Sequence, residues 1–176
     1  MKKLISLIII IMMVLSAVSC RSSGLVENTG DSSGKQSECG TDTPEPGEWY
    51  FVLDGVRVDL LKALPENIPS PDRIYEIDSC ASQGKDNVYV YGSVQITLYS
   101  NRGVEIPYNI EFFDDGVSTV EGVRIGSSYD DMIAAYGSDF AKSNTMYDYV
   151  NGDVTLSFKI EDGIVTSILY QAEVKF

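Results

Sequence analysis

The sequence lacks histidine entirely, and its 176 residues include only 13 lysines and arginines and three cysteines. The missing histidine removes the most common general base and metal ligand, and it excludes a Ser-His-Asp triad. With neither histidine nor a CxxC motif, zinc and thiol-redox sites are not expected. We therefore predict no cofactor, no metal site and no catalytic residues.

Basic residues are scarce, and 26 acidic residues give a formal net charge of −13. Such a charge keeps a domain soluble and disfavours nucleic acid as a partner. The acidic pairs at 114–115, 130–131 and 161–162 could suggest calcium, but no EF-hand spacing is present. We expect these pairs to serve local roles in turns and at a helix start.

No apolar run is long enough to cross a bilayer as a helix. Met1 to Lys3 is basic, and Leu4 to Val18 is an apolar run of about 15 residues, where a span needs about 20. A basic start, a short apolar run and small residues describe a signal peptide. We assign residues 1–19 to it.

The segment Ser16–Cys20 resembles a lipobox, the processing site of bacterial lipoproteins, with Ala17 at the position where leucine is commonest. The resemblance implies that Cys20 carries diacylglycerol and fatty acids such as palmitate and becomes the mature N-terminus. Two or more acyl chains give stable membrane anchoring. Loss of Lys2 and Lys3 with the leader leaves 11 basic against 26 acidic residues, a formal charge of −15. The expected location is extracytoplasmic, lipid-anchored to the cell membrane.

Residues 20–48 comprise the lipidated Cys20 and a tether rich in Ser, Gly, Thr, Glu and Pro. Such a composition buries too little apolar surface to order a chain, so we predict disorder. Cys39 and Cys80 could form a disulfide outside the cytoplasm, or both could remain free thiols. The sequence decides neither this alternative nor the oligomeric state.

A short helix is predicted within the remaining domain, 49–176, after the strand-like segment 120–125. Ser127 is a favourable N-cap, Asp130 would stand at the third helical position, and Gly137 is a natural stop. Apolar residues between them recur at helical spacing, which indicates an amphipathic helix.

Alternation of apolar and polar residues predicts the strands. After the helix we expect a strand that begins with Tyr147 and Tyr149, a strand over 154–160 and a returning strand over 164–175. The turn between the last two is Glu161-Asp162-Gly163.

The first half of the domain repeats this pattern less regularly. Residues 53–58 match 120–125 position by position, and the leucines of 60–64 suggest a short helix ended by a proline. Strands over 89–98 and 106–112 follow. We therefore predict an α+β fold of two tandem units, about 49–116 and about 117–176. Their strands would form one antiparallel sheet with helices on one face and the other face open.

Two sets of motifs carry a resemblance to known families. Gly122–Ser128, with Ala135-Tyr136-Gly137 after it, resembles small bacterial lipoproteins of the SmpA/OmlA and β-lactamase-inhibitor-like group. Asp78–Asp86 and Asp114–Gly122 are similar to segments of uncharacterised surface lipoproteins of anaerobic Gram-positive bacteria. The resemblance implies helix-plus-sheet units, singly or in tandem, and a binding or scaffold role outside the cytoplasm. No residue of an inhibitory motif can be transferred.

Seven tyrosines fall in predicted strands, where core packing is their usual role. Tyrosines on an open sheet face would instead provide large contact area at low entropic cost. We select Tyr89, Tyr91, Tyr147 and Tyr149 as the candidate binding residues. The expected function is a non-catalytic binding or scaffold module for an extracytoplasmic protein, and the acidic charge favours a partner that presents basic residues. An inhibitor of a secreted or cell-wall enzyme is the alternative, and a carboxylate-based glycan hydrolase is a weaker one.

Overall fold

The computed structural model describes residues 48–79 and 84–175, which belong to one compact unit, Asp42–Phe176. The predicted signal peptide, Cys20, Cys39 and Cys80 lie outside the described residues. Lipidation and the disulfide therefore stay predictions. No helix within the described ranges has the length and apolar character needed to cross a membrane.

The described chain is largely β-structure with a single short helix. In chain order its elements are β1 (Tyr50–Leu53), β2 (Val56–Asp59), β3 (Arg73–Asp78), β4 (Lys85–Tyr91), β5 (Val94–Asn101), β6 (Val104–Phe112), α1 (Tyr129–Tyr136), β7 (Ala141–Ser143), β8 (Met146–Asn151), β9 (Val154–Glu161) and β10 (Ile164–Ala172).

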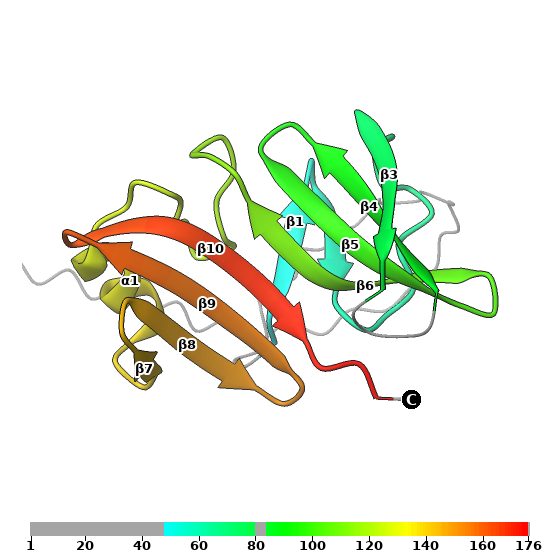
Figure 1. Ribbon diagram of the computed structural model, residues 1–176. Coiled ribbons are helices and arrows are strands. Elements are labelled where there is room, and N and C mark those ends of the chain that lie inside the picture. The colour runs from blue at the N-terminus through cyan, green and yellow to red at the C-terminus, as the bar shows by residue number, and fades with distance from the viewer. Residues whose placement is uncertain (1–47, 80–83, 176) are drawn as a thin grey trace, which may run out of the picture. The chain divides into compact units, whose positions relative to one another are not determined.

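Eight of these strands form one antiparallel sheet in the order β3-β4-β5-β6-β10-β9-β8-β7, and β1 and β2 form a separate hairpin. The central contact joins β6 to β10, with Ile110 opposite Tyr170. The strands of each predicted unit therefore occupy one half of the sheet, β3 to β6 and β7 to β10 (Figure 1). A single antiparallel sheet with matched strands agrees with the expectation from the sequence.

Tight turns with positive φ at both central residues connect several strands. Asp54 and Gly55 have φ of 48° and 82°, and Asp162 and Gly163 have φ of 51° and 78°. These angles fit type I′ turns, whose twist matches that of the flanking strands. Aspartate tolerates the left-handed conformation better than most residues, and glycine adopts it freely. The predicted turn at 161–163 is thereby confirmed.

Side chains on the two faces of the sheet alternate along every strand. One row of cross-strand neighbours lies on the side of the core and starts at the sheet edge with Ile74, which is itself 55% exposed: Ile74, Tyr89, Ile96, Ile110, Tyr170, Leu156 and Tyr149. Ile96, Ile110 and Leu156 are 0% exposed. We call this side the covered face, because the hairpin and α1 pack against it and lie behind the sheet in Figure 1.

The hairpin and the helix cover different parts of the sheet. Phe51 of β1 packs its ring 5.3 Å from that of Phe112 in β6. On the other half, Tyr136 of α1 lies 5.1 Å from Phe158 in β9, and the α1 residue Met132 is fully buried. Full burial of side chains of this size stabilises a fold by roughly 1.5–3 kcal/mol each, so both covers contribute to one core.

The helix begins one residue later than predicted. Ser128, not Ser127, is the N-cap, and the third helical residue is Asp131, not Asp130. Ser128 Oγ accepts from the Asp131 N–H at 3.1 Å, while Asp131 Oδ2 accepts from the Ser128 N–H at 3.0 Å. This reciprocal capping box explains the shift, because Asp131 completes it. The helix ends at Tyr136, before Gly137, as expected.

The prediction of tandem helix-plus-sheet units is wrong in its helices. Residues 60–61 form a turn and 62–64 are irregular, and Leu61 has a φ of 62°. The Leu61 and Leu64 N–H groups donate to the carbonyls of Pro107 and Glu105 in β6, at 2.8 and 2.9 Å. These tertiary bonds satisfy the backbone groups that a helix would have used, and Pro65 opposes helix continuation.

Residues 120–125 are also not a strand. The Gly122 N–H donates to the Thr119 carbonyl at 2.9 Å, and the Thr119 N–H donates to the Val123 carbonyl at 2.8 Å. The segment is a turn that leads into α1. Two edge strands, β3 and β7, were not predicted, and β10 ends at Ala172 rather than Lys175.

Candidate binding face

The face of the sheet opposite the core forms the candidate site. One row along it crosses all eight strands: Arg73, Val90, Gln95, Glu111, Leu169, Ser157, Asp148 and Ala141. Only Ser157 in this row is buried, at 7% exposure. We call this row, with Tyr75, Asn109, Gln171, Thr155, Val150 and Lys159 beside it, the open face. Val88 and Thr97, which lie between Tyr75 and Asn109 in the sheet, are 1% and 5% exposed and do not belong to it.

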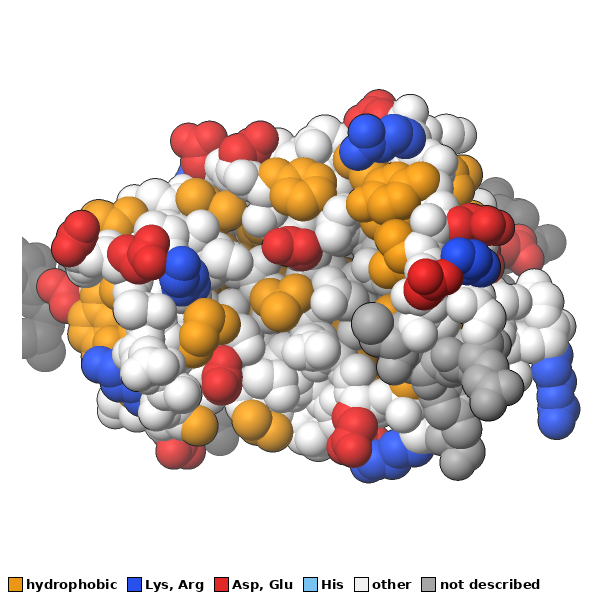
Figure 2. Space-filling view, viewed as in Figure 1, with side chains coloured by type: hydrophobic (Ala, Val, Ile, Leu, Met, Phe, Trp, Pro, Cys, Tyr) orange, Lys and Arg blue, Asp and Glu red, His pale blue; other side chains and the backbone are white. Residues whose placement is uncertain are grey.

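The open face differs in charge from the protein as a whole. Its charged members are two basic residues, Arg73 and Lys159, and two acidic residues, Glu111 and Asp148. Figure 2 shows this side as mainly uncharged polar and backbone surface, with separate apolar groups and a few acids and bases. The net charge of −13 is therefore not concentrated here, and it does not define what this face binds.

A hydrogen-bonded chain of side chains runs over three strands of the open face. The Tyr75 hydroxyl on β3 donates to Gln95 Oε1 on β5 at 3.2 Å, and Gln95 Nε2 donates to Glu111 Oε2 on β6 at 2.9 Å. The Arg73 guanidinium lies 5.2 Å from the centre of the Tyr75 ring, within cation–π range. These contacts hold four polar side chains in a defined arrangement at the surface.

The centre of the open face keeps unused hydrogen-bonding capacity. Asn109 Oδ1 is buried and has no hydrogen-bond partner among the described residues. Its cross-strand neighbour Gln171 is exposed, and Thr155 on β9 follows in the same row. The exposed side-chain amide of Gln171 supplies both donors and an acceptor, so it can bond to polar groups of a partner.

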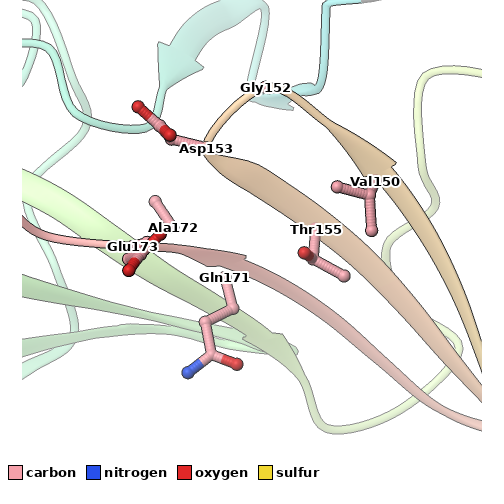
Figure 3. A pocket seen from close by; sticks show the side chains of 7 residues that line it. All are labelled: Val150, Gly152, Asp153, Thr155, Gln171, Ala172 and Glu173. Carbon is pink, nitrogen blue, oxygen red and sulfur yellow. The ribbon is translucent and has the colours of Figure 1, made fainter.

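A shallow depression of about 340 Å³ lies where β8, β9 and β10 meet at one end. Figure 3 shows Val150, Thr155 and Gln171 on these strands, with Asp153 in the β8–β9 turn and Glu173 beyond β10. Outside the lining, Lys175 Nζ lies 2.5 Å from an Asp153 oxygen and 3.8 Å from Glu173. The hydrogen bond to Asp153 is the main cause that raises the pKa of Lys175.

The four tyrosines selected from the sequence lie on the covered face. Register pairs Tyr89 with Ile96, Tyr91 with Val94, Tyr147 with Phe158 and Tyr149 with Leu156. Tyr91, Tyr147 and Tyr149 are between 4% and 8% exposed, and Tyr89 is half-buried. The expectation that they line the open face is therefore wrong, although a binding role for them is not tested by their burial alone.

Their surroundings explain this placement. Tyr149 donates to the carbonyl of Gly137 at 2.8 Å, and Tyr89 donates to Glu105 Oε2 at 2.5 Å. Burial is the main cause that raises the pKa of Tyr89, Tyr91 and Tyr149 to about 12. The alternation in β8 contained the signal, because Tyr147 and Tyr149 flank the acidic Asp148, which faces the opposite way.

All three acidic pairs have the local roles predicted for them, and the third contributes Asp162 to the β9–β10 turn. Asp114 accepts from the Gly116 N–H at 2.8 Å, and a Ser93 hydrogen bond is the main cause that lowers its pKa. Asp131 belongs to the capping box, and hydrogen bonding from Ser128 lowers its pKa. Over the described ranges, no three acidic, cysteine or histidine side chains gather as a metal site.

Asp86 is the one acidic residue that is buried among the described residues, at 0% exposure. Its Oδ2 accepts from the Tyr108 hydroxyl at 2.8 Å. Sequence reasoning missed this pair, as it missed Gln95, Glu111 and Gln171, because polar residues at alternate strand positions look the same whether solvent, core or a partner lies beside them.

Comparison with protein-family models, curated proteins and solved structures finds no match to this chain.

Proposed function

We propose that the protein is a non-catalytic binding or scaffold module, held outside the cytoplasm through acylated Cys20, whose open face receives a protein partner. The observation that supports this is a row across all eight strands in which every member except Ser157 is exposed or half-buried, opposite the face that the hairpin and α1 cover. A sheet with one packed face is already stable, so its other face is free to evolve contacts.

A macromolecular partner suits this face better than a small ligand. Small-molecule sites are usually enclosed pockets, whereas the depression at the end of β8–β10 is shallow. Protein interfaces mix apolar and polar groups and cover about 800 Å² on each partner. Tyr75, Leu169 and Val150 supply apolar surface among amide and hydroxyl groups on the open face.

Photo-crosslinking in intact cells tests the partner. A photoreactive residue in place of Gln95 or Gln171 should crosslink one extracytoplasmic protein, and one in place of the exposed Ser138 should not. The variant Gln95→Ala/Leu169→Asp/Gln171→Ala should lose the purified complex, while Lys62→Ala/Glu66→Ala/Ser138→Ala retains it. Equal binding by both variants, each shown to be folded by circular dichroism, would refute the open face as the site.

An activity assay of the partner in the same purified complex distinguishes a scaffold role from an inhibitor role. If the partner is a secreted hydrolase and loses its activity at a one-to-one ratio, the protein is an inhibitor rather than a scaffold. Unchanged partner activity supports the scaffold role.

The anchor is tested independently by mass spectrometry of the mature protein from membranes. We expect a diacylglycerol-modified Cys20 at the N-terminus and release of a Cys20→Ala variant from the membrane fraction. An unmodified N-terminus at another residue would contradict the lipoprotein assignment.

A further inference from the structure

The two edges of the eight-stranded sheet are built differently. The β7 edge has three residues, and its central Lys142 places Nζ 4.7 Å from the centre of the Tyr147 ring. The β3 edge has six residues, Arg73–Asp78, with neither lysine nor proline among them. Short strands, prolines and charged side chains, lysines above all, protect sheet edges from added strands. The β7 edge combines a short strand with a lysine, whereas the longer β3 edge has only the charged side chains of Arg73, Glu76 and Asp78 and is therefore the less protected of the two.

The β3 strand is regular and presents backbone groups along its outer side. It pairs with β4 over six successive residues without a register shift. Beyond the strand, the Ser79 N–H donates to the Gly84 carbonyl at 3.1 Å, in the same register. Because bonded and non-bonded pairs alternate in antiparallel ladders, the odd-numbered residues bond to β4. The N–H and C=O groups of Ile74, Glu76 and Asp78 then point away from the sheet.

The side chains along this edge are exposed and define the chemistry of a partner strand. Ile74 is 55% exposed, and Glu76 has no ion-pair partner among the described residues. Asp78 on the same side contacts Lys85. A strand laid against β3 would place an apolar side chain opposite Ile74 and a basic one opposite Glu76, since opposite charges on directly facing residues are favourable.

A second copy of the chain fits this edge poorly. A two-fold axis centred on Glu76 would bring two Glu76 carboxylates face to face, and one centred on Tyr75 would place Asp72 opposite Asp78. Like charges directly opposite are destabilising. The formal charge of −13 on each chain adds long-range repulsion.

We propose that the edge of β3, which pairs with no second strand among the described residues, binds an extended, basic segment of a partner protein as a ninth strand of the sheet. Backbone hydrogen bonds from Ile74 and Glu76 provide the register, and the Glu76 carboxylate selects a lysine or arginine in the added strand. Strand addition of this kind draws its affinity from main-chain bonds and its specificity from alternate side chains. This site is separate from the contacts proposed for the open face and does not rest on them.

A designed peptide tests the edge directly. Its sequence, Lys-Val-Lys-Thr-Val-Thr, places lysines opposite Asp78 and Glu76 and valine opposite Ile74 in an antiparallel arrangement. Two matched controls are the peptide with glutamate in place of lysine and the peptide with N-methyl groups on the residues whose amides would face β3. Fluorescence anisotropy with the purified full chain should show binding of the first peptide and loss of binding for both controls.

Two variants of the protein locate the site. Glu76→Pro removes an outward N–H without removing a bond to β4, and proline is tolerated where the N–H of an edge strand faces solvent. Glu76→Lys reverses the charge and leaves the backbone intact. Each should weaken binding about tenfold or more, which is the loss of about 1.4 kcal/mol. Lys142→Glu on the β7 edge should bind the peptide as the wild type does.

The proposal is overturned if both Glu76 variants remain folded and bind the peptide normally, or if the acidic peptide binds equally well. It is also overturned if NMR shifts caused by the peptide fall on Gln95 and Gln171 instead of Ile74 and Glu76. A wild-type dimer in sedimentation experiments that Glu76→Pro dissociates would show that a second copy, not a basic segment, occupies the edge. Shifts confined to β3 and β4, lost with Glu76→Lys, support it.

Discussion

In both halves of the sheet the strands follow chain order from the edge to the centre, but the two halves are covered by different elements. β3 to β6 are packed beneath the β1–β2 hairpin and the loop after it, whereas β7 to β10 are packed beneath α1. Both halves contribute to one continuous core cluster. The comparison shows that a half-sheet requires an apolar cover of suitable size, and that a hairpin and a helix can each meet this requirement.

The two covers differ at one turn position in otherwise similar segments. The segments Leu53–Val58 and Val120–Ile125 have similar sequences, but the first forms a hairpin and the second an irregular turn before the helix. Asp54 and Gly55 both have positive φ, whereas at the second site Gly122 does and Glu121 does not. Glutamate adopts the left-handed conformation less readily than aspartate, so only the first segment can make a type I′ turn easily.

The largest expected effect comes from removing the main aromatic contact of the hairpin. Phe51 is 0% exposed, so Phe51→Ala should lower the free energy of unfolding by about 3–5 kcal/mol. Val52 is 40% exposed, and Val52→Ala should change it by no more than about 0.5 kcal/mol. Urea unfolding followed by circular dichroism measures both. A Phe51→Ala loss below about 1 kcal/mol would mean that the hairpin is not an essential cover.

Removing a buried side chain from the helix cover should reduce stability by a similar or somewhat smaller amount. Met132 is 0% exposed, and Met132→Ala should destabilise the protein by about 2–5 kcal/mol. Because both covers belong to one core, the variant should still unfold in a single transition, as measured by far-ultraviolet circular dichroism and Trp49 fluorescence. Separate transitions by the two methods would show that the two halves are independent folding units.

If the left-handed conformation at Asp54 favours the hairpin, substitutions at this residue should have a smaller effect on stability that depends on the new residue. Asp54→Ala should destabilise the hairpin by about 1–2 kcal/mol, because alanine must adopt a left-handed conformation at a φ of 48°. Asn tolerates this conformation, so Asp54→Asn should retain most of the stability. Equal losses in the two variants, measured by urea unfolding, would show that the carboxylate and not the backbone conformation matters.

The smallest effect is expected at the helix cap. Ser128→Ala should cost about 1 kcal/mol, and Ser138→Ala, outside the helix, should be nearly neutral. The folded-state pKa of Asp131 is lowered, so its contribution is present near neutral pH and is lost as the pH falls through that pKa. Wild-type stability should therefore fall more than that of Asp131→Asn between pH 7 and about pH 3. If the stabilities of the wild type and of Asp131→Asn change with pH in parallel, the capping box is not the source of the pH dependence.

Local patterns predicted β8, β9 and β10 and the turn between the last two strands well. Alternating apolar residues located β9 and most of β10, and Asp162-Gly163 located the turn between them. Alternation failed in β4, where Val88, Tyr89, Val90 and Tyr91 are all apolar or aromatic and mark neither face. The inward position of Tyr89 and Tyr91 follows from their pairing with Ile96 and Val94, which are known only from the sheet register.

Edge strands and loops depended even more on distant contacts. Nothing in Arg73–Asp78 marks a strand strongly, and it becomes one by pairing with β4. Likewise, the leucines of 60–64 have helical spacing, but their N–H groups bond to carbonyls of β6 more than 40 positions along the chain. Tertiary hydrogen bonds of this kind override weak local preference.

The sequence by itself determined the strand periodicity, the type I′ turn at 162–163, and the presence and extent of one capped helix to within a residue. These features depend on backbone preferences and side-chain bonds between residues a few positions apart. Only the tertiary structure decided which face of the sheet is covered, which edge is the less protected, and that a hairpin rather than a second helix completes the core. Those outcomes depend on strand register and on the packing of distant segments, and short-range sequence patterns do not encode either.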